Sequence, residues 1–199
     1  MEPVIAGLAK AEGAATQPGK GKCNFLFMLA DDLGWKDLGC QGSSFYDTPN
    51  LDRLAAGGTR FTSAYAACPV CSPTRASIMT GRYPARLGLT DFIGGGRSAK
   101  LITPRFLNRL PLEEVTIAEA LKQAGYATFF AGKWHLGPEG CWPENQGFDV
   151  NMGGTNSGMP SGGNKYFSPY GNPRLPDGPP GEHLPARLAV ETAKFIEAH

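Results

Sequence analysis

The sequence predicts an α/β fold in which a mainly parallel sheet is flanked by helices. Two continuous apolar runs of strand length, at residues 23–30 and 126–131, are typical of strands buried on both faces, as in a parallel sheet. Segments with helix signals alternate with these runs, and alternation of strands and helices is the pattern of α/β proteins. We expect the sheet to be incomplete within these 199 residues.

Helix signals here are a Ser, Thr or Pro at the start of a segment and a Gly at the end of most of them. The predicted helices cover residues 49–56, 72–80, 117–124 and 184–198. In the third of these helices, Ile117, Ala120, Leu121 and Ala124 form one apolar face. Residues 59–65 are a weaker strand candidate, and residues 91–112 and 137–183 are expected to be loops and turns.

Composition excludes several classes of protein. Hydrophobic residues make up 41% of the chain, which is too many for a disordered protein. The 19 Lys and Arg nearly balance the 18 Asp and Glu, so nothing predicts a nucleic-acid partner. No apolar run approaches the roughly 18 residues of a membrane span. Residues 1–22 are expected to be a flexible N-terminal segment, and they lack the pattern of a signal peptide.

Asp31 and Asp32 directly follow the first predicted strand. Adjacent carboxylates repel each other unless a positive charge neutralises them, and Ca²⁺ or Mg²⁺ prefers such oxygen ligands. Loop or helix-capping acids are the alternative interpretation. Because ligands of parallel sheets bind beyond the carboxyl ends of the strands, we expect Asp31 and Asp32 to lie at the same edge as Lys133 and His135, which follow the second predicted strand.

Cys71 lies at the start of a predicted helix, where backbone N–H groups favour an anion, and Arg75 follows one turn later. A Cys in such a place is expected to be reactive. The residues alone leave open a thiolate nucleophile, a redox thiol and a modified Cys. Cys68 and Cys71 form a C-x-x-C, but a zinc site needs a second pair of ligands and Cys141 stands alone.

Lys133 and His135 are two residues apart, a spacing that puts both side chains on one face of an extended segment. If the extended conformation continues through residues 132–137, both cations point to one site, and Trp134 points the other way into packing. A solvated Lys and a packed His are the alternative interpretation.

The segment CSPTRASIMTGR at residues 71–82 resembles the C-x-P-x-R signature and TGR element of the sulfatases of the alkaline phosphatase superfamily. Residues 25–42 resemble the first strand and metal-binding acids of that family, and GKWHLG at 132–137 resembles its lysine-histidine element. Residues 45–63 and 147–154 are similar to the family as well. The resemblance implies that residues 23–199 are the N-terminal part of a sulfatase catalytic domain with an alkaline phosphatase-like fold.

The resemblance also implies a chemistry. A separate maturation enzyme would convert Cys71 to Cα-formylglycine, whose hydrate attacks sulfur with one hydroxyl and expels sulfate by losing the proton of the other. Asp31, Asp32 and the hydrate oxygen of residue 71 would bind Ca²⁺ (or Mg²⁺). Arg75 would hold the hydrate, Lys133 would bridge hydrate and sulfate oxygens, and His135 would be the base.

The expected function is therefore that of a sulfuric ester hydrolase of arylsulfatase type, with a sulfate ester as substrate. Family members are longer and carry further cations and metal ligands in their second half, so this chain alone is expected to be incomplete. Two alternatives stay open: a phosphodiester or phosphonate monoester hydrolase of the same superfamily, and a catalytically incomplete fragment. The family suggests a periplasmic or extracellular location, but no signal peptide is visible, so the compartment stays open.

Overall fold

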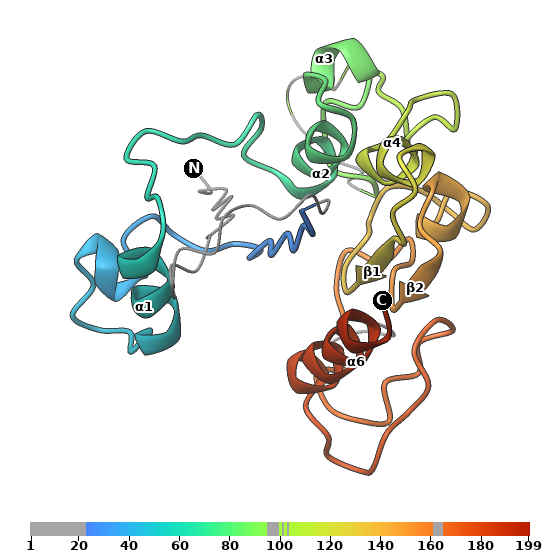
Figure 1. Cartoon of the computed structure of the whole chain (residues 1–199). Helices are drawn as coiled ribbons and strands as arrows, with labels where there is room; N and C mark the ends of the chain where they lie inside the picture. The colour runs from blue at the N-terminus through green and yellow to red at the C-terminus, as the bar shows by residue number, and fades with distance from the viewer. Residues whose placement is uncertain (1–22, 95–99, 101, 103, 161–164) are drawn as a thin grey trace. The chain divides into compact units, whose positions relative to one another are not determined.

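The computed structural model describes residues 23–94, 100, 102, 104–160 and 165–199. The predicted flexible segment, residues 1–22, lies outside the described residues. The chain divides into two compact units, Met1–Pro69 and Val70–His199 (Figure 1). Each unit has its own internal contacts.

The first unit is built around the helix α1 (Pro49–Gly57) and the short 3-10 helix η1 (Gly39–Gln41). Thr48 Oγ1 accepts a hydrogen bond from Gly39 N at 2.8 Å, and Asp52 Oδ1 accepts one from Cys40 N at 2.7 Å. Two side chains from the start of α1 therefore fasten η1 to the helix. The helix predicted after Thr48 is confirmed.

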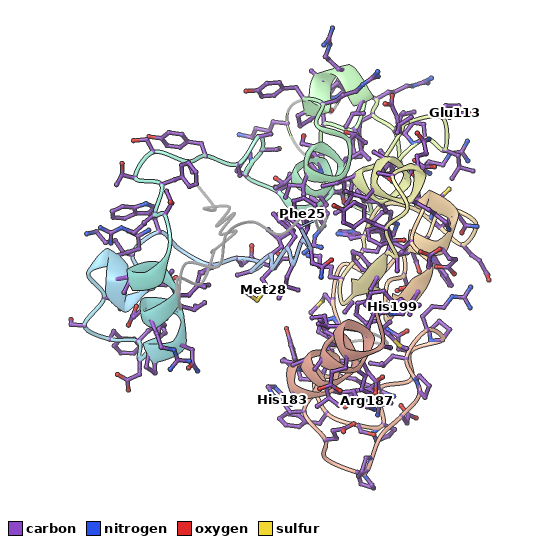
Figure 2. All side chains as sticks on the ribbon, in the orientation of Figure 1. Phe25, Met28, Glu113, His183, Arg187 and His199 are labelled. Carbon is purple, nitrogen blue, oxygen red and sulfur yellow. The ribbon has the colours of Figure 1, made fainter. Side chains whose placement is uncertain are left out.

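The strands predicted at residues 23–30 and 59–65 are absent from the described structure of this unit. We expected the first run to be buried on both faces, yet Phe25 and Met28 are 51% and 54% exposed (Figure 2). A strand forms only when a neighbouring strand completes its backbone hydrogen bonds, and neither segment belongs to a sheet in the described part of the chain. An apolar run of strand length is thus insufficient by itself to form a strand.

The second unit has an α/β architecture with a small parallel sheet. Strands β1 (Phe129–Ala131) and β2 (Val150–Met152) pair in parallel, with Phe130 opposite Asn151. Its other elements are α2 (Cys71–Thr80), α3 (Pro84–Leu87), α4 (Ile117–Gln123), η2 (Pro143–Gln146) and α6 (Leu184–Ala198). The parallel sheet confirms the predicted fold class. Strand β2 and helix α3 were not predicted, and β1 is shorter than the predicted run.

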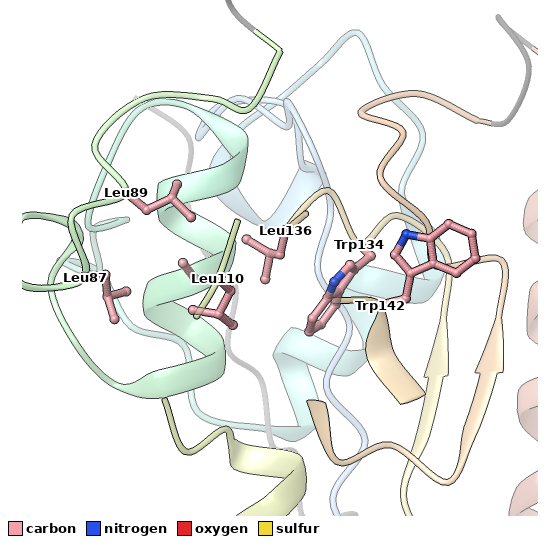
Figure 3. Packing of buried hydrophobic residues seen from close by; sticks show 7 residues of the cluster. Leu87, Leu89, Leu110, Trp134, Leu136 and Trp142 are labelled. Carbon is pink, nitrogen blue, oxygen red and sulfur yellow. The ribbon is translucent and has the colours of Figure 1, made fainter. Parts of the chain in front are cut away.

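A hydrophobic core lies between α2, α3 and the chain that follows β1 (Figure 3). It is made by Ala76, Leu87, Leu89, Leu110, Trp134, Leu136 and Trp142. The indole Nε1 of Trp134 donates to the carbonyl of Cys141 at 2.8 Å, so the polar atom of this buried ring is satisfied. Because Trp134 and Leu136 flank His135 in sequence, the core fixes the backbone on both sides of that residue.

Helix α4 buries a different face from the one predicted. Ala118 is buried, whereas Ile117 is 49% exposed. The cause is close contact with η2: Thr116 Oγ1 donates to Gln146 O at 2.7 Å, and a Cβ on Gly147 would lie 2.6 Å from Glu119 N. This contact at the start of α4 sets the rotation of the helix about its own axis. The periodicity of apolar residues gives no information about such a contact.

Helix α6 packs on β1 (Figure 1). The ring of Phe195 stacks on that of Phe129, with the ring centroids 4.8 Å apart. Its bounds agree with the prediction for residues 184–198. Among the described residues, no helix combines the length and apolar character that crossing a bilayer requires.

Candidate functional site

Cys71 is the first residue of α2. Val70 before it is extended, with φ −130° and ψ 159°, and Pro73 lies in the first turn, where its missing N–H costs no hydrogen bond. Gly81 ends the helix in the left-handed conformation, with φ 68°. Cys71 is half-buried and is a free thiol, so the C-x-x-C holds no disulfide.

The N-terminus of α2 has no cap from its own side chains. Val70 is apolar and provides no capping hydrogen bond, and the first turn contains no acidic residue. The backbone N–H groups and the positive end of the helix dipole therefore keep their preference for an anion. This is the electrostatic setting that the sequence predicted around Cys71.

Arg75 ties α2 to the segment that follows β1. Its guanidinium Nη1 donates a hydrogen bond to the backbone carbonyl of Lys133, 58 residues further along the chain. Arg75 and Lys133 are both half-buried. The second unit therefore brings the helix that begins with Cys71 into direct contact with the segment that carries Lys133 and His135.

The conformation of this segment differs from the prediction. A shared face for Lys133 and His135 required extended backbone through residues 132–137, but Gly132 has φ 102° and His135 has φ 58°. Alternation along a strand therefore cannot explain the orientation of Lys133 and His135. The prediction for Trp134 is confirmed, since its side chain is buried in the core.

The imidazole of His135 is buried and held by backbone groups. Its Nε2 lies 2.8 Å from the carbonyl oxygen of Ile93, and its own backbone N–H donates to Thr155 O at 3.0 Å. Its left-handed backbone, rare for a residue with a side chain, marks a position that the surrounding structure determines. His135 is thus a fixed group of this site.

Asp31 and Asp32 belong to the first unit, whereas Cys71, Arg75, Lys133 and His135 belong to the second. Both carboxylates are exposed, and Asp32 has a left-handed backbone with φ 56°. Two hard oxygen donors fit Ca²⁺ or Mg²⁺, although they supply only part of the six to eight oxygens that Ca²⁺ takes. In the described ranges no three His, Cys, Asp or Glu side chains gather as a set able to hold an ion.

Sequence reasoning missed three residues around His135. Ser72 is fully buried and accepts a hydrogen bond from Ile93 N at 3.0 Å, and Gly158 lies against the imidazole ring. Ile93 contributes only its backbone carbonyl, and Gly158 contributes only the space left by its missing side chain. Neither contribution can be recognised from the sequence. Ser72 stands inside the motif, but nothing in its neighbours indicates that it is buried.

Comparison with known proteins agrees with this arrangement. A sequence model of the Sulfatase family matches residues 23–199. The chain is 48% identical to human arylsulfatase A over 133 residues, which is 65% of this chain and 25% of arylsulfatase A. It is 40% identical to N-acetylgalactosamine-6-sulfatase of Rattus norvegicus over 179 residues, which is 89% of this chain and 32% of that protein.

Comparison with solved structures also finds a similar protein. The crystal structure of Ps i-CgsB superposes with a TM-score of 0.66 at 29% identity, covering 84% of this chain and 40% of that chain. The chain thus spans between 25% and 32% of the length of the two curated relatives above. The match extends over the Cys71 helix, the Lys133–His135 segment and the parallel strands, and the chain belongs to the sulfatase family.

Proposed function

We propose that this chain carries the nucleophile-bearing part of a sulfuric ester hydrolase of arylsulfatase type. The observation that supports this proposal best is the hydrogen bond from Arg75 to the backbone of Lys133. It joins two motifs that are far apart in sequence at the uncapped start of α2, where an anion is favoured. The family membership and the arylsulfatase and N-acetylgalactosamine-6-sulfatase relatives support the same reaction class.

In this proposal Cys71 is the residue that a maturation enzyme converts to Cα-formylglycine. The hydrate of formylglycine supplies two hydroxyls on one carbon. One can bond to sulfur while the S–O bond to the ester's alcohol breaks and the alcohol leaves, and the other can then expel sulfate. The N–H groups at the start of α2 stabilise negative charge on this hydrate. Arg75, fixed through its bond to Lys133 O, holds the hydrate in place.

Lys133 and His135 act on the transferring group and on the proton. The ammonium of Lys133 stabilises the charge that develops on hydrate and sulfate oxygens. The imidazole of His135 accepts the proton of the second hydroxyl, while the O–H electron pair forms the new C=O bond and the C–O bond to sulfate breaks. Both residues follow β1 closely in sequence, which supports a shared role.

Asp31 and Asp32 are the residues proposed to hold a divalent cation, Ca²⁺ or Mg²⁺. Such an ion supplies positive charge that lowers the pKa of a bound hydroxyl and stabilises the transferring group. The two carboxylates are exposed and thus accessible to an ion. Further oxygen ligands are required for a complete shell around Ca²⁺.

Mass spectrometry of the peptide that contains Cys71 tests the nucleophile. After co-expression with a formylglycine-generating enzyme, we expect a mass about 18 Da below that of the unmodified peptide, since the thiol is lost and a carbonyl is gained. Cys71→Ala is the negative variant, and Cys68→Ala is the matched control that leaves the signature residue in place. An unmodified Cys71 in the co-expressed protein contradicts the proposal.

Paired esters of one phenol test the reaction. The matured protein is expected to hydrolyse 4-nitrophenyl sulfate faster than 4-nitrophenyl phosphate, and this activity should be absent from Cys71→Ala. Faster phosphate ester hydrolysis would instead support the related phosphodiester or phosphonate hydrolases. Complete conversion of Cys71 without turnover of either ester would contradict an active chain and support a catalytically incomplete fragment.

A further inference from the structure

We propose that Ser72 and Gly158 are positioning residues for His135, and that they fix which ring nitrogen of this histidine accepts a proton. The inference deepens the proposed function, on which the catalytic part of it rests. Ser72 occupies a variable position of the C-x-P-x-R pattern and contacts the hydrogen-bond partner of the imidazole. Gly158 lies outside the C-x-P-x-R, TGR and lysine-histidine patterns and contacts the ring itself.

The first step is the hydrogen bond between His135 Nε2 and Ile93 O, at 2.8 Å. A carbonyl oxygen only accepts hydrogen bonds, so Nε2 must carry the proton. In the neutral imidazole the other nitrogen, Nδ1, then has the lone pair. Nδ1 is therefore the nitrogen that accepts the hydroxyl proton in the proposed reaction.

The second step is that Ser72 holds Ile93 in place. The backbone N–H of Ile93 donates to Ser72 Oγ at 3.0 Å, and Ser72 is fully buried. Ser72 directly follows Cys71 in the first turn of α2. One residue thus bonds through its N–H to the helix that carries the nucleophile and through its C=O to the base, so the helix and the imidazole are linked through the backbone of Ile93.

The third step is the contact of Gly158 with the ring. A Cβ on Gly158 would lie 2.7 Å from His135 Cε1 and 3.0 Å from both ring nitrogens. The distances from this Cβ to the two ring nitrogens are only slightly longer than its distance to Cε1. Such similar distances place the Cβ above the face of the ring, since a Cβ at the edge would lie much farther from the nitrogens than from Cε1. A Cβ at position 158 therefore forces either the imidazole or the backbone of residue 158 to shift, which disturbs the ring that Ile93 O holds.

The tautomer is measured directly, without substrate, by long-range ¹H–¹⁵N correlation on protein labelled in its histidines. The chain contains three histidines, so His183→Gln and His199→Gln variants assign the signals. At about pH 8, where an ordinary imidazole is neutral, we expect the wild-type His135 signal to have the pattern of Nε2–H. An Nδ1–H pattern would overturn the proposal whatever the activity of the protein.

Ser72→Ala tests the link through Ile93. We expect a mixed tautomer signal and a loss of roughly tenfold in kcat with KM within about twofold, because the base is misplaced while binding groups stay. Ser72→Thr keeps the hydroxyl and should restore the Nε2–H pattern. Ser77→Ala is the matched control: it removes a hydroxyl of the same helix that has no hydrogen-bond partner among the described residues, and it should change neither readout.

Rates are compared per molecule of formylglycine, so that altered maturation is not mistaken for altered positioning. An unchanged tautomer and kcat in Ser72→Ala would overturn the role of Ser72. If that variant does not fold, Gly158→Ala decides, since it leaves the Ser72–Ile93 bond in place and should shift the ring signals and lower kcat. Nε2–H in the wild type together with no turnover of any sulfate ester would contradict the proposed function, not the positioning.

Discussion

The starts of helices α2 and α4 in the second unit differ in how their free N–H groups are used. At α4, Thr116 accepts a hydrogen bond from Glu119 N at 3.2 Å, and Glu119 Oε2 accepts one from Thr116 N at 2.8 Å. This capping box satisfies free backbone N–H groups at the start of α4 with side chains of the helix's own first residues. At α2, Val70 provides no cap and Cys71 comes first.

The presence of a cap at the start of α4 and its absence at the start of α2 suggest different roles: the first helix start contributes to stability and the second to function. The hydroxyl of Thr116 also donates to the buried carbonyl of Gln146, so the α4 start is part of the packing of this unit. At the α2 start Val70 provides no side-chain cap, and in the proposed function this helix start stabilises an anion. We expect substitutions at the α4 start to change the free energy of unfolding, and substitutions at the α2 site to change activity.

The largest expected effect is on activity at the α2 site. Lys133→Ala removes the ammonium but keeps the carbonyl that accepts from Arg75. We expect kcat/KM for 4-nitrophenyl sulfate to fall at least about 100-fold, because a charge aimed at the transferring group is lost, with little change in the urea unfolding midpoint. Lys194→Ala, an exposed lysine on α6, is the control. Comparable activity of both variants would refute the role of Lys133.

The next effect is on stability at the α4 start. Thr116→Ala removes the cap and leaves the buried Gln146 carbonyl without this donor. The free energy of unfolding should fall by about 1–3 kcal/mol, measured by urea denaturation. Thr116→Ser keeps the hydroxyl and should recover most of the loss. Activity per folded molecule should stay at the wild-type value, and a change in kcat would break the separation of the two helix starts.

Adding a cap to α2 sharpens the comparison. Val70→Asp supplies a carboxylate to the first-turn N–H groups and should stabilise the helix by roughly 0.5–1 kcal/mol. The same carboxylate competes with the anion at residue 71, so activity should decrease while the thermal midpoint rises. Val70→Asn caps without a full charge and isolates the charge effect. Higher activity in Val70→Asp would contradict an anion site at this helix start.

The smallest effect is expected at the other end of α4. Lys122 Nζ lies 2.5 Å from Asp149 Oδ1, and this contact, with hydrogen bonds from Thr128, holds the pKa of Asp149 below its usual value of 3.8. A lowered pKa in the folded state gives stability that is present above pH 3.8 and is lost as the pH falls below it. Because both side chains are partly exposed, the contribution should be below about 1 kcal/mol.

Asp149→Asn tests this contribution. Its deficit in the free energy of unfolding relative to the wild type should be visible near neutral pH and should shrink as the pH falls through 3.8. Lys122→Met removes the same ion pair from the other side, and the double variant measures the coupling between the two residues. A deficit that grows on acidification has the wrong sign and would contradict the ion pair as its source.

Local sequence signals predicted most of the helices, and the sequence motifs predicted the family. Pro49 opens α1, Thr116 caps α4 with its own side chain, and Gly81 ends α2 in the left-handed conformation, so α1, α2 and α4 could be predicted without tertiary information. The order of Cys71, Arg75, Lys133 and His135 was sufficient to indicate a sulfatase. These features depend on neighbours a few residues away, which a sequence shows directly.

Only the tertiary structure decided the rest. Strand β2 exists because Val150–Met152 pairs with β1, whereas residues 23–30, with a stronger apolar signal, form no strand in the described structure. The left-handed backbone of His135 and its bond to Ile93 O depend on the core around Trp134 and on contacts 42 residues apart. Backbone pairing and ring orientation are set by whichever groups arrive from distant parts of the chain, and no local pattern of residues encodes them.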